Sequence, residues 1–157
     1  MRIVTGLLTA VLLIAGLGVS NAAIRISNDK GGRIGAYLDR FEAIKRSGDT
    51  VIIDGLCASA CTLVLGTVPQ GRICVTPRAK LGFHAAWNPG PNGTPVVNPE
   101  ATRIMHSMYP AHIRQWIVRN GGLKSRMIFL NGRALSTMYR PCYESAEREQ
   151  ARPVSAR

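Results

Sequence analysis

The segment 23–54 limits the possible folds most strongly, because it has the pattern of a strand, a helix and a second strand. Ala23–Ser27 alternates apolar and polar residues, as a short half-buried strand does. Residues 33–46 carry apolar side chains three and four positions apart, which predicts an amphipathic helix. Residues 51–53 form a β-branched apolar run typical of a buried strand. Such a unit implies parallel pairing with a right-handed crossover, so we expect an α/β domain with a mostly parallel sheet.

The two ends of the chain differ from this central part. Residues 1–22 have the features of a secretory signal peptide: Arg2, then an apolar run over 7–17 that is short for a membrane span, then small residues that suit cleavage. We therefore expect a periplasmic or secreted protein, with an uncleaved membrane anchor as the alternative. Residues 23–142 are then one domain. The charged and polar stretch 143–157 predicts a disordered tail.

The second half of the domain predicts further short elements. Strands are expected at 72–76 and 80–85, and the stretch 87–99, rich in Pro, Gly and Asn, is expected to be an irregular loop. A helix is expected from residue 99 to about residue 120, with a kink at Pro110.

The formal net charge of +11 at pH 7 bears on the partners of this protein. The basic residues are scattered and are not interleaved with aromatic ones, so we expect no specific binding of nucleic acid. Weak attraction to anionic surfaces of the cell envelope is the simpler expectation. The sequence has no Gly-x-x-x-x-Gly-Lys-Ser/Thr loop, and we expect no nucleotide or other cofactor.

Four cysteines suggest one or two disulfides in an oxidising compartment. They are Cys57, Cys61, Cys74 and Cys142. Three connectivities are open, and one hypothesis is a bridge from Cys57 or Cys61 to Cys74 or Cys142, which would fix the turn between the first two. A Cys-x3-Cys pair with a histidine nearby is also compatible with zinc. A second ligand pair is missing, so disulfides are favoured and no metal site is expected.

Three short motifs each sit where an expected strand ends, and together they suit acyl transfer. They are Asp29-Lys30-Gly31-Gly32, Gly55-Leu56-Cys57-Ala58-Ser59-Ala60-Cys61 and Leu81-Gly82-Phe83-His84. Ser59 is the candidate nucleophile and His84 its candidate base. The backbone N–H groups of Gly31, Gly32 and Ala60 are candidate donors to an oxyanion. Each residue alone has an ordinary role as a helix cap, a half-buried histidine or a turn glycine, and it is their order that favours catalysis.

These motifs resemble those of the Clp-type serine peptidases in the Clp/crotonase superfamily. Extended back to Ile26, the first resembles the oxyanion strand and turn; the second resembles the nucleophile turn, with Ser59 at the catalytic serine; and the third resembles the strand that bears the catalytic histidine, here His84. The Cys-x-Ser-Ala-Cys variant is similar to that of exported bacterial relatives. Over about residues 24–140 the resemblance implies an abbreviated Clp/crotonase-like βαβ-layered domain, hydrolysis of peptides or another acyl substrate, and a homo-oligomer.

The chain also departs from the pattern of that family. The family's third triad member, an Asp, precedes an Arg-Phe-Leu-like segment, and here Met127 stands in its place. A backbone carbonyl or Asn131 is then the candidate for orienting His84. Lys30 and Lys80 are weaker candidates for a lysine base. The family's first strand and helix are missing, which implies an abbreviated sheet. A catalytically silent fold that acts as a binding or scaffolding module in the envelope is therefore the alternative to a serine hydrolase.

Overall fold

Strand β2 (Thr50–Ala58) is the centre of a six-stranded sheet in the computed structural model, which describes residues 22–142. It pairs in parallel along its whole length with β1 (Ala23–Asp29). Its other edge is shared: the first half pairs in parallel with β3 (Ile73–Val75) and the second half with β4 (Lys80–Phe83). The α/β class and the mostly parallel sheet are thus confirmed.

Two further strands complete the sheet at its edges. β7 (Ile128–Asn131) runs antiparallel to β4, and β8 (Arg140–Pro141) runs parallel to β3. The short helix α6 (Gly132–Ser136) follows β7 directly. The antiparallel edge strand β7 brings the segment that precedes it, including Met127, beside the end of β4.

The expected strand–helix–strand unit is present. Helix α2 (Ile34–Ser47) joins β1 to β2 and buries Phe41 and Ile44 of its apolar face. It ends at Gly48, whose φ of 84° is the left-handed conformation that glycine adopts at little cost. After β2 the chain turns directly into the 3₁₀ turn η1 (Ser59–Leu63) and the short helix α3 (Val64–Thr67), both of which contact α2.

The long helix expected near the carboxyl end is two helices. α4 (Pro99–Met108) begins at Asn98, whose side chain accepts a hydrogen bond from the N–H of Ala101, and α5 (Ala111–Arg119) follows after Tyr109 and Pro110. Proline disfavours a helical conformation in the residue before it, and Tyr109 accordingly has a ψ of 148°. The expected kink is therefore a complete break.

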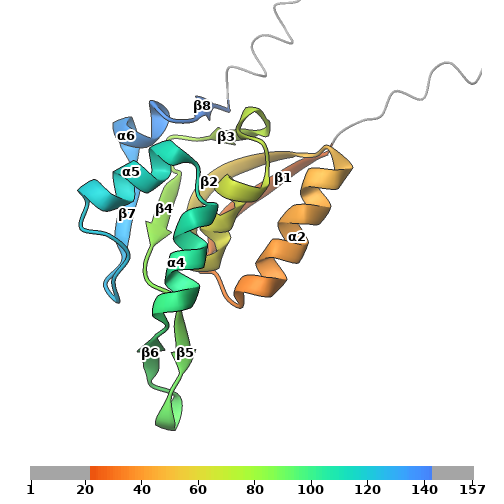
Figure 1. Ribbon diagram of the computed structural model, residues 1–157. Helices are drawn as coiled ribbons and strands as arrows, with labels where there is room; N and C mark the ends of the chain where they lie inside the picture. Colours follow the sequence, from red (N-terminus) through yellow and green to blue (C-terminus); the bar gives the residue numbers. More distant parts are fainter. Residues whose placement is uncertain (1–21, 143–157) are drawn as a thin grey trace, which may run out of the picture.

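The segment expected to be an irregular loop is in fact a small hairpin, and that expectation was wrong. β5 (Trp87–Pro89) and β6 (Pro95–Val97) pair antiparallel around the 3₁₀ turn η3 (Pro91–Gly93). An earlier 3₁₀ turn, η2 (Gln70–Arg72), precedes β3. Positive φ angles at Asn92 and Gly93 let the chain reverse. The hairpin extends beyond the end of β4, away from the six-stranded sheet (Figure 1).

The cysteines form two disulfides, Cys57–Cys61 and Cys74–Cys142. The expected disulfides are confirmed, but the hypothesis of a bridge from Cys57 or Cys61 to Cys74 or Cys142 was wrong. Cys57 lies close to the turn that carries Cys61, and their Cα atoms are 5.3 Å apart. Because these two cysteines bond to each other, neither is available to Cys74 or Cys142. The second bridge ties β3 to the residue after β8. Two disulfides are consistent with a location outside the cytoplasm.

One buried carboxylate links three segments of the fold. Asp54, 5% exposed, accepts hydrogen bonds from Arg25 of β1 and from Thr76 and Arg78, which follow β3. These hydrogen bonds, above all those from the Arg78 guanidinium, outweigh burial and hold the pKa of the Asp54 carboxyl far below its usual range. Asp54 is therefore charged throughout the physiological range and joins β1, β2 and the β3–β4 connection.

The expected polar tail lies outside the described residues. So does the expected signal peptide, except for Ala22. Within residues 22–142, no helix has both the length and the apolar character that a membrane crossing requires.

The Asp54 cluster predicts a loss of stability in acid. A carboxyl whose pKa is lowered by folding contributes stability above its unfolded pKa of about 3.9, and that contribution is lost as the pH falls further. We expect the free energy of unfolding, measured by urea denaturation, to fall below about pH 4. The Asp54→Asn variant should show a smaller fall over the same range. The exposed Asp39→Asn is the matched control, and curves of equal slope for all three proteins would contradict the prediction.

The two disulfides should differ in their contribution to stability. They join residues 4 and 68 positions apart, and the longer loop restricts the unfolded chain more. Replacing Cys74 and Cys142 with alanine should lower the free energy of unfolding by about 4 kcal/mol, and replacing Cys57 and Cys61 by about 2 kcal/mol. Chemical denaturation of both double variants measures this. The reverse order would show that the small loop contributes more than its chain entropy.

Candidate active site

The three motifs meet because three parallel strands end at one edge of the sheet. In the strand register Asp29 of β1 lies opposite Cys57 of β2, and Gly82 of β4 lies opposite Ala58. Ser59, the Gly31 turn and His84 each follow within two residues of these pairs. The carboxyl edge of a parallel sheet is where such connections gather polar groups, and this is the edge on which the candidate residues converge.

Ser59 occupies a strained position at the end of β2. Its φ is 57°, in the left-handed region that non-glycine residues rarely adopt. The chain passes here from the extended Ala58 directly into η1, and the Cys57–Cys61 disulfide closes the turn around Ser59. The side chain is half-buried, while Cys57, Ala58, Ala60 and Cys61 around it are buried. Backbone strain of this kind is held in place by surrounding structure and is concentrated at functional sites.

A buried chain of hydrogen bonds holds the Ser59 backbone from within the core. Thr62 Oγ1 lies 2.7 Å from the Ser59 carbonyl oxygen and 2.7 Å from the Tyr109 hydroxyl. The threonine hydroxyl has one proton, which it donates to the carbonyl, so the tyrosine hydroxyl must donate to Thr62. Burial raises the pKa of Tyr109 to about 12, which keeps this donor protonated. Thr62 and Tyr109 are thus positioning residues for Ser59.

The glycine turn lies against the nucleophile turn. Gly31 has a φ of 83°, and a Cβ atom on it would lie 2.5 Å from the Cβ of Ser59 and 2.8 Å from the nitrogen of Ala60. No side chain fits there. The turn is anchored by Asp29, whose Oδ1 accepts hydrogen bonds from the Gly31 N–H at 2.9 Å and from the Tyr37 hydroxyl. Burial, aided by the hydrogen bond to Asp29 and by the charge of that carboxylate, raises the pKa of Tyr37 to about 12.

The hydrogen bond to Asp29 corrects one sequence expectation. Since the Gly31 N–H already donates to that carboxylate, it is not available to an oxyanion. The N–H of Gly32 has no hydrogen-bond partner among residues 22–142. Ala60 is the second residue of η1, and N–H groups in the first turn of a helix lack partners within it. Gly32 and Ala60 therefore stay the predicted oxyanion donors, and Gly31 supplies the close approach.

Ser59, His84, Gly31 and Gly32 line one cavity of about 780 Å³. This volume is in the range of pockets that hold small ligands or a few residues of a peptide. One wall comes from the β1–α2 turn and the start of α2, and another from the β5–β6 hairpin with Trp87. Met105 of α4 also lines it. The cavity thus brings together four of the sequence-predicted site residues, while the fifth, Ala60, is buried directly after Ser59 and does not line it.

The hydrogen bond of His84 determines which ring nitrogen is able to act as a base. Its Nδ1 lies 2.7 Å from the carbonyl oxygen of Ala85. A carbonyl only accepts, so Nδ1 must carry the proton and Nε2 keeps the lone pair in the neutral ring. The half-buried ring is therefore oriented by a backbone carbonyl, which was one of the two groups expected from the sequence.

Neither the expected Asn131 nor a carboxylate accompanies His84. Asn131 lies opposite Lys80 at the start of β4, whereas His84 follows its end. His84 instead shares a hollow of about 250 Å³ with Met127 and Ser125. The Met127 sulfur lies over Gly82, where a Cβ atom would come within 2.6 Å of it. Among residues 22–142, no Asp or Glu lines either the large cavity or this hollow.

The two lysines considered as bases lie in different places. Lys30 lines the large cavity together with Ser59, but its side chain is exposed, and a lysine acts as a base more readily where burial favours its neutral form. The ammonium of Lys80 lies 4.0 Å from the centre of the Phe129 ring, at the start of β4. Of the three candidates for a base, His84 and Lys30 line the cavity with Ser59, and Lys80 does not. No group of three His, Cys, Asp or Glu side chains among residues 22–142 is arranged to hold a metal ion.

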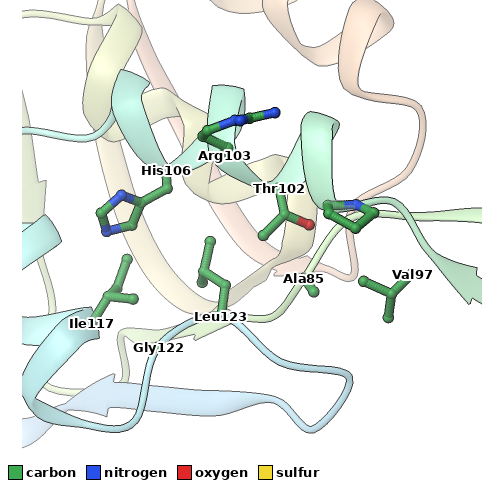
Figure 2. Close-up of a pocket in the computed structure, with 9 residues that line it drawn as sticks. Ala85, Val97, Thr102, Arg103, His106, Ile117, Gly122 and Leu123 are labelled. Atoms are coloured by element: carbon green, nitrogen blue, oxygen red, sulfur yellow. The ribbon is translucent and has the colours of Figure 1, made fainter.

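A second hollow, of about 330 Å³, lies beside α4 (Figure 2). Thr102 and His106 of that helix lie across it from the loop of Gly122 and Leu123, and Arg103 also lines it. Its one hydroxyl is already used: Thr102 Oγ1 accepts from the Ala86 N–H and donates to the Asn98 carbonyl. Thr102 thus fixes the base of the hairpin.

Comparisons with known proteins add a similarity of the backbone only. No protein-family model matches the sequence, and no curated protein does. Among solved structures, the chain is similar to a mutant of ClpP1 from Listeria monocytogenes. The two are 16% identical with a TM-score of 0.46, and the match covers 85% of this chain and 78% of that chain. The similarity is one of chain course and says nothing of catalysis.

Several residues of the site were missed by the sequence reasoning. Thr62 stands three residues after Ser59, a spacing at which a threonine hydroxyl often bonds a backbone carbonyl, so a signal existed. Tyr109 lies 47 residues beyond Thr62 in the chain, and no local pattern relates them. The sequence did not predict that Trp87 and Met105 line the cavity either, because the hairpin and α4 come close to Ser59 only in the folded protein.

The contact between the two turns predicts that Gly31→Ala is strongly disruptive. A Cβ atom there meets Ser59 and Ala60, and alanine resists a φ of 83°. We expect the free energy of unfolding to fall by about 2 kcal/mol or more, because strain adds to overpacking. Gly71→Ala is the control, since a Cβ atom at Gly71 meets nothing within 4 Å. Thermal and chemical denaturation measure both, and equal stability of the two variants would contradict the prediction.

Proposed function

We propose that this protein is an exported serine hydrolase, peptidase-like in its chemistry, which uses a Ser59–His84 dyad on a peptide or another acyl substrate. The observation that carries the proposal is the shared cavity: Ser59, at a φ of 57°, lines it with His84 and Gly32. A serine in this strained turn, a histidine with a free Nε2 and an unbonded N–H are the parts that acyl transfer needs.

The proposed reaction uses these groups in sequence. His84 Nε2 takes the proton of Ser59 Oγ as that oxygen attacks the acyl carbon. The N–H groups of Gly32 and Ala60 hold the negative oxygen of the tetrahedral intermediate. The intermediate expels the amine or alcohol, which takes the proton from His84, and leaves an acyl-enzyme. Water, activated in turn by His84, releases the acid and restores Ser59.

The oriented carbonyl of Ala85 performs part of the work of a triad acid. It holds the ring and fixes the tautomer in which Nε2 is the base. A neutral carbonyl stabilises the imidazolium less than a carboxylate, and loss of a triad acid's charge lowers the rate about 10⁴-fold in a well-studied case. We therefore expect slow turnover, with acylation of Ser59 more readily observed than multiple cycles.

The location and assembly of the protein belong to the same proposal. A cleaved signal peptide in residues 1–22 would deliver the chain to the periplasm or the exterior, and the two disulfides fit such a compartment. Assembly into a homo-oligomer and weak attraction to anionic envelope surfaces are retained as predictions. Measurement of the mass of the purified protein in solution tests the first.

A catalytically silent binding or scaffolding module is the second candidate function. Met127 beside His84, in place of an acid, favours it. A silent module predicts that Ser59 and His84 are replaceable together without loss of function in the cell. A hydrolase predicts loss of function with either replacement and little change in folding.

Labelling with a fluorophosphonate tests the hydrolase directly. The purified, oxidised protein should be labelled at Ser59, and labelling should disappear in Ser59→Ala and fall at least about 100-fold in His84→Ala, because an unassisted serine hydroxyl is a poor nucleophile. Mass spectrometry of the intact protein and of its peptides gives the extent and the site.

Two controls give this experiment its meaning. Ser107→Ala removes an exposed hydroxyl of α4 that donates to Ile104, and it should label as the wild type does. Circular dichroism must show the same fold in all variants. A folded wild-type protein that is never labelled would sink the hydrolase proposal and favour the silent module.

A further inference from the structure

We infer that the Ser59 cavity selects acidic peptides, with a Glu or Asp side chain within about two residues of the acyl group that reacts. The inference rests on the proposed function for its chemistry and adds the substrate class. It is carried by the charges that line the cavity, which are of one sign.

The cations lie on one wall. Lys30 and Arg33 flank the glycine turn, one before and one after it, and both line the cavity with Ser59. Among residues 22–142, neither of them forms an ion pair with an acidic side chain. The cations that do form one there are Arg25, Arg40, Lys45 and Arg78. No carboxylate lines the cavity within the same part of the chain. An unbalanced pair of cations beside a hollow attracts a negatively charged ligand group.

The nearest carboxylate does not cancel this charge. Asp29 immediately precedes Lys30, but its Oδ1 is occupied by the Gly31 N–H and the Tyr37 hydroxyl, and its Oδ2 lies 3.3 Å from Arg40. Arg40 stands two helical turns along α2 from the cavity wall. Asp29 is therefore directed into the base of the turn, and Lys30 and Arg33 are left to face the ligand.

The other walls indicate that the ligand is a peptide and not a small anion alone. Trp87 and Pro89 of the hairpin, Ile34 of α2 and Met105 of α4 provide apolar surface around the same 780 Å³. A lone anion would leave that surface in contact with water, whereas a peptide with apolar neighbours covers it. The cavity thus suits an acidic residue on the side of the glycine turn and apolar residues on the side of the hairpin.

A protection experiment measures this selectivity without needing turnover. Three capped tetrapeptides that differ only in one central residue, Glu, Gln or Lys, compete with a fluorophosphonate for Ser59. Exposed charge pairs contribute modestly to binding, so we expect half-protection by the Glu peptide at a concentration about fivefold lower than by the Gln peptide. The Lys peptide should protect least. The preference should shrink as salt rises towards 1 M, where the screening length is about 3 Å.

Charge reversal supplies the variants. Lys30→Glu with Arg33→Glu should invert the order, so that the Lys peptide protects best. Arg46→Glu is the matched control: it reverses an exposed charge near the other end of α2, outside the cavity, and should leave the order unchanged. A merely structural effect of the double variant would weaken protection by all three peptides together and would not exchange their order.

The outcomes separate this inference from the proposed function. Labelling with equal protection by the three peptides overturns the acidic preference and leaves the hydrolase standing. If the single variant Lys30→Glu is not labelled while Arg33→Glu is labelled normally, Lys30 is the base. That result also overturns the acidic preference. If the wild type is not labelled, the hydrolase fails, and titration of the tryptophan fluorescence, to which Trp87 at the cavity contributes, with the same peptides decides whether the cavity still prefers the acidic one.

Discussion

The close approach of the Gly31 backbone to the Ser59–Ala60 turn is the constraint on which the rest of the site depends. It requires that β1 and β2 end in register, that no Cβ atom stands between the turns, and that each turn is held from its own side. The sheet meets the first requirement and glycine the second. Asp29 braces one turn, while the Cys57–Cys61 disulfide and the Thr62–Tyr109 pair brace the other.

Two carboxylates, those of Asp29 and Asp54, have structural partners in this fold. Asp29 organises the glycine turn, and Asp54 ties β1 to β2 and to the segment after β3. His84 is left with a backbone carbonyl as its partner and with Met127 as its neighbour. The arrangement therefore holds Ser59 and the glycine turn firmly, while the His84 ring has no carboxylate partner among residues 22–142.

Much of this architecture follows from local sequence patterns. The apolar spacing in 33–46 and the β-branched run at 51–53 predicted α2 and β2, and parallel pairing then placed the ends of the strands together. The cysteine pairing was not predictable, because a bridge depends on distances between Cβ atoms that only the folded turn defines. The hairpin was mistaken for a loop since its short strands contain Pro89 and Pro95, residues that sheets usually exclude. The hydrogen bond from Tyr109 joins distant parts of the chain and has no local signal.

The β5–β6 hairpin forms a wall of the cavity without belonging to the main sheet. Its strands pair with each other, and its base is fixed by bonds of Ala86 to Asn98 and Thr102. Ser59, His84 and the glycine turn, which form the proposed catalytic site, stand on other segments. A longer, shorter or differently shaped hairpin would thus change what fits the cavity while leaving these residues where they are. The fold thus places the residues of the proposed dyad and the wall that bounds the ligand on different segments.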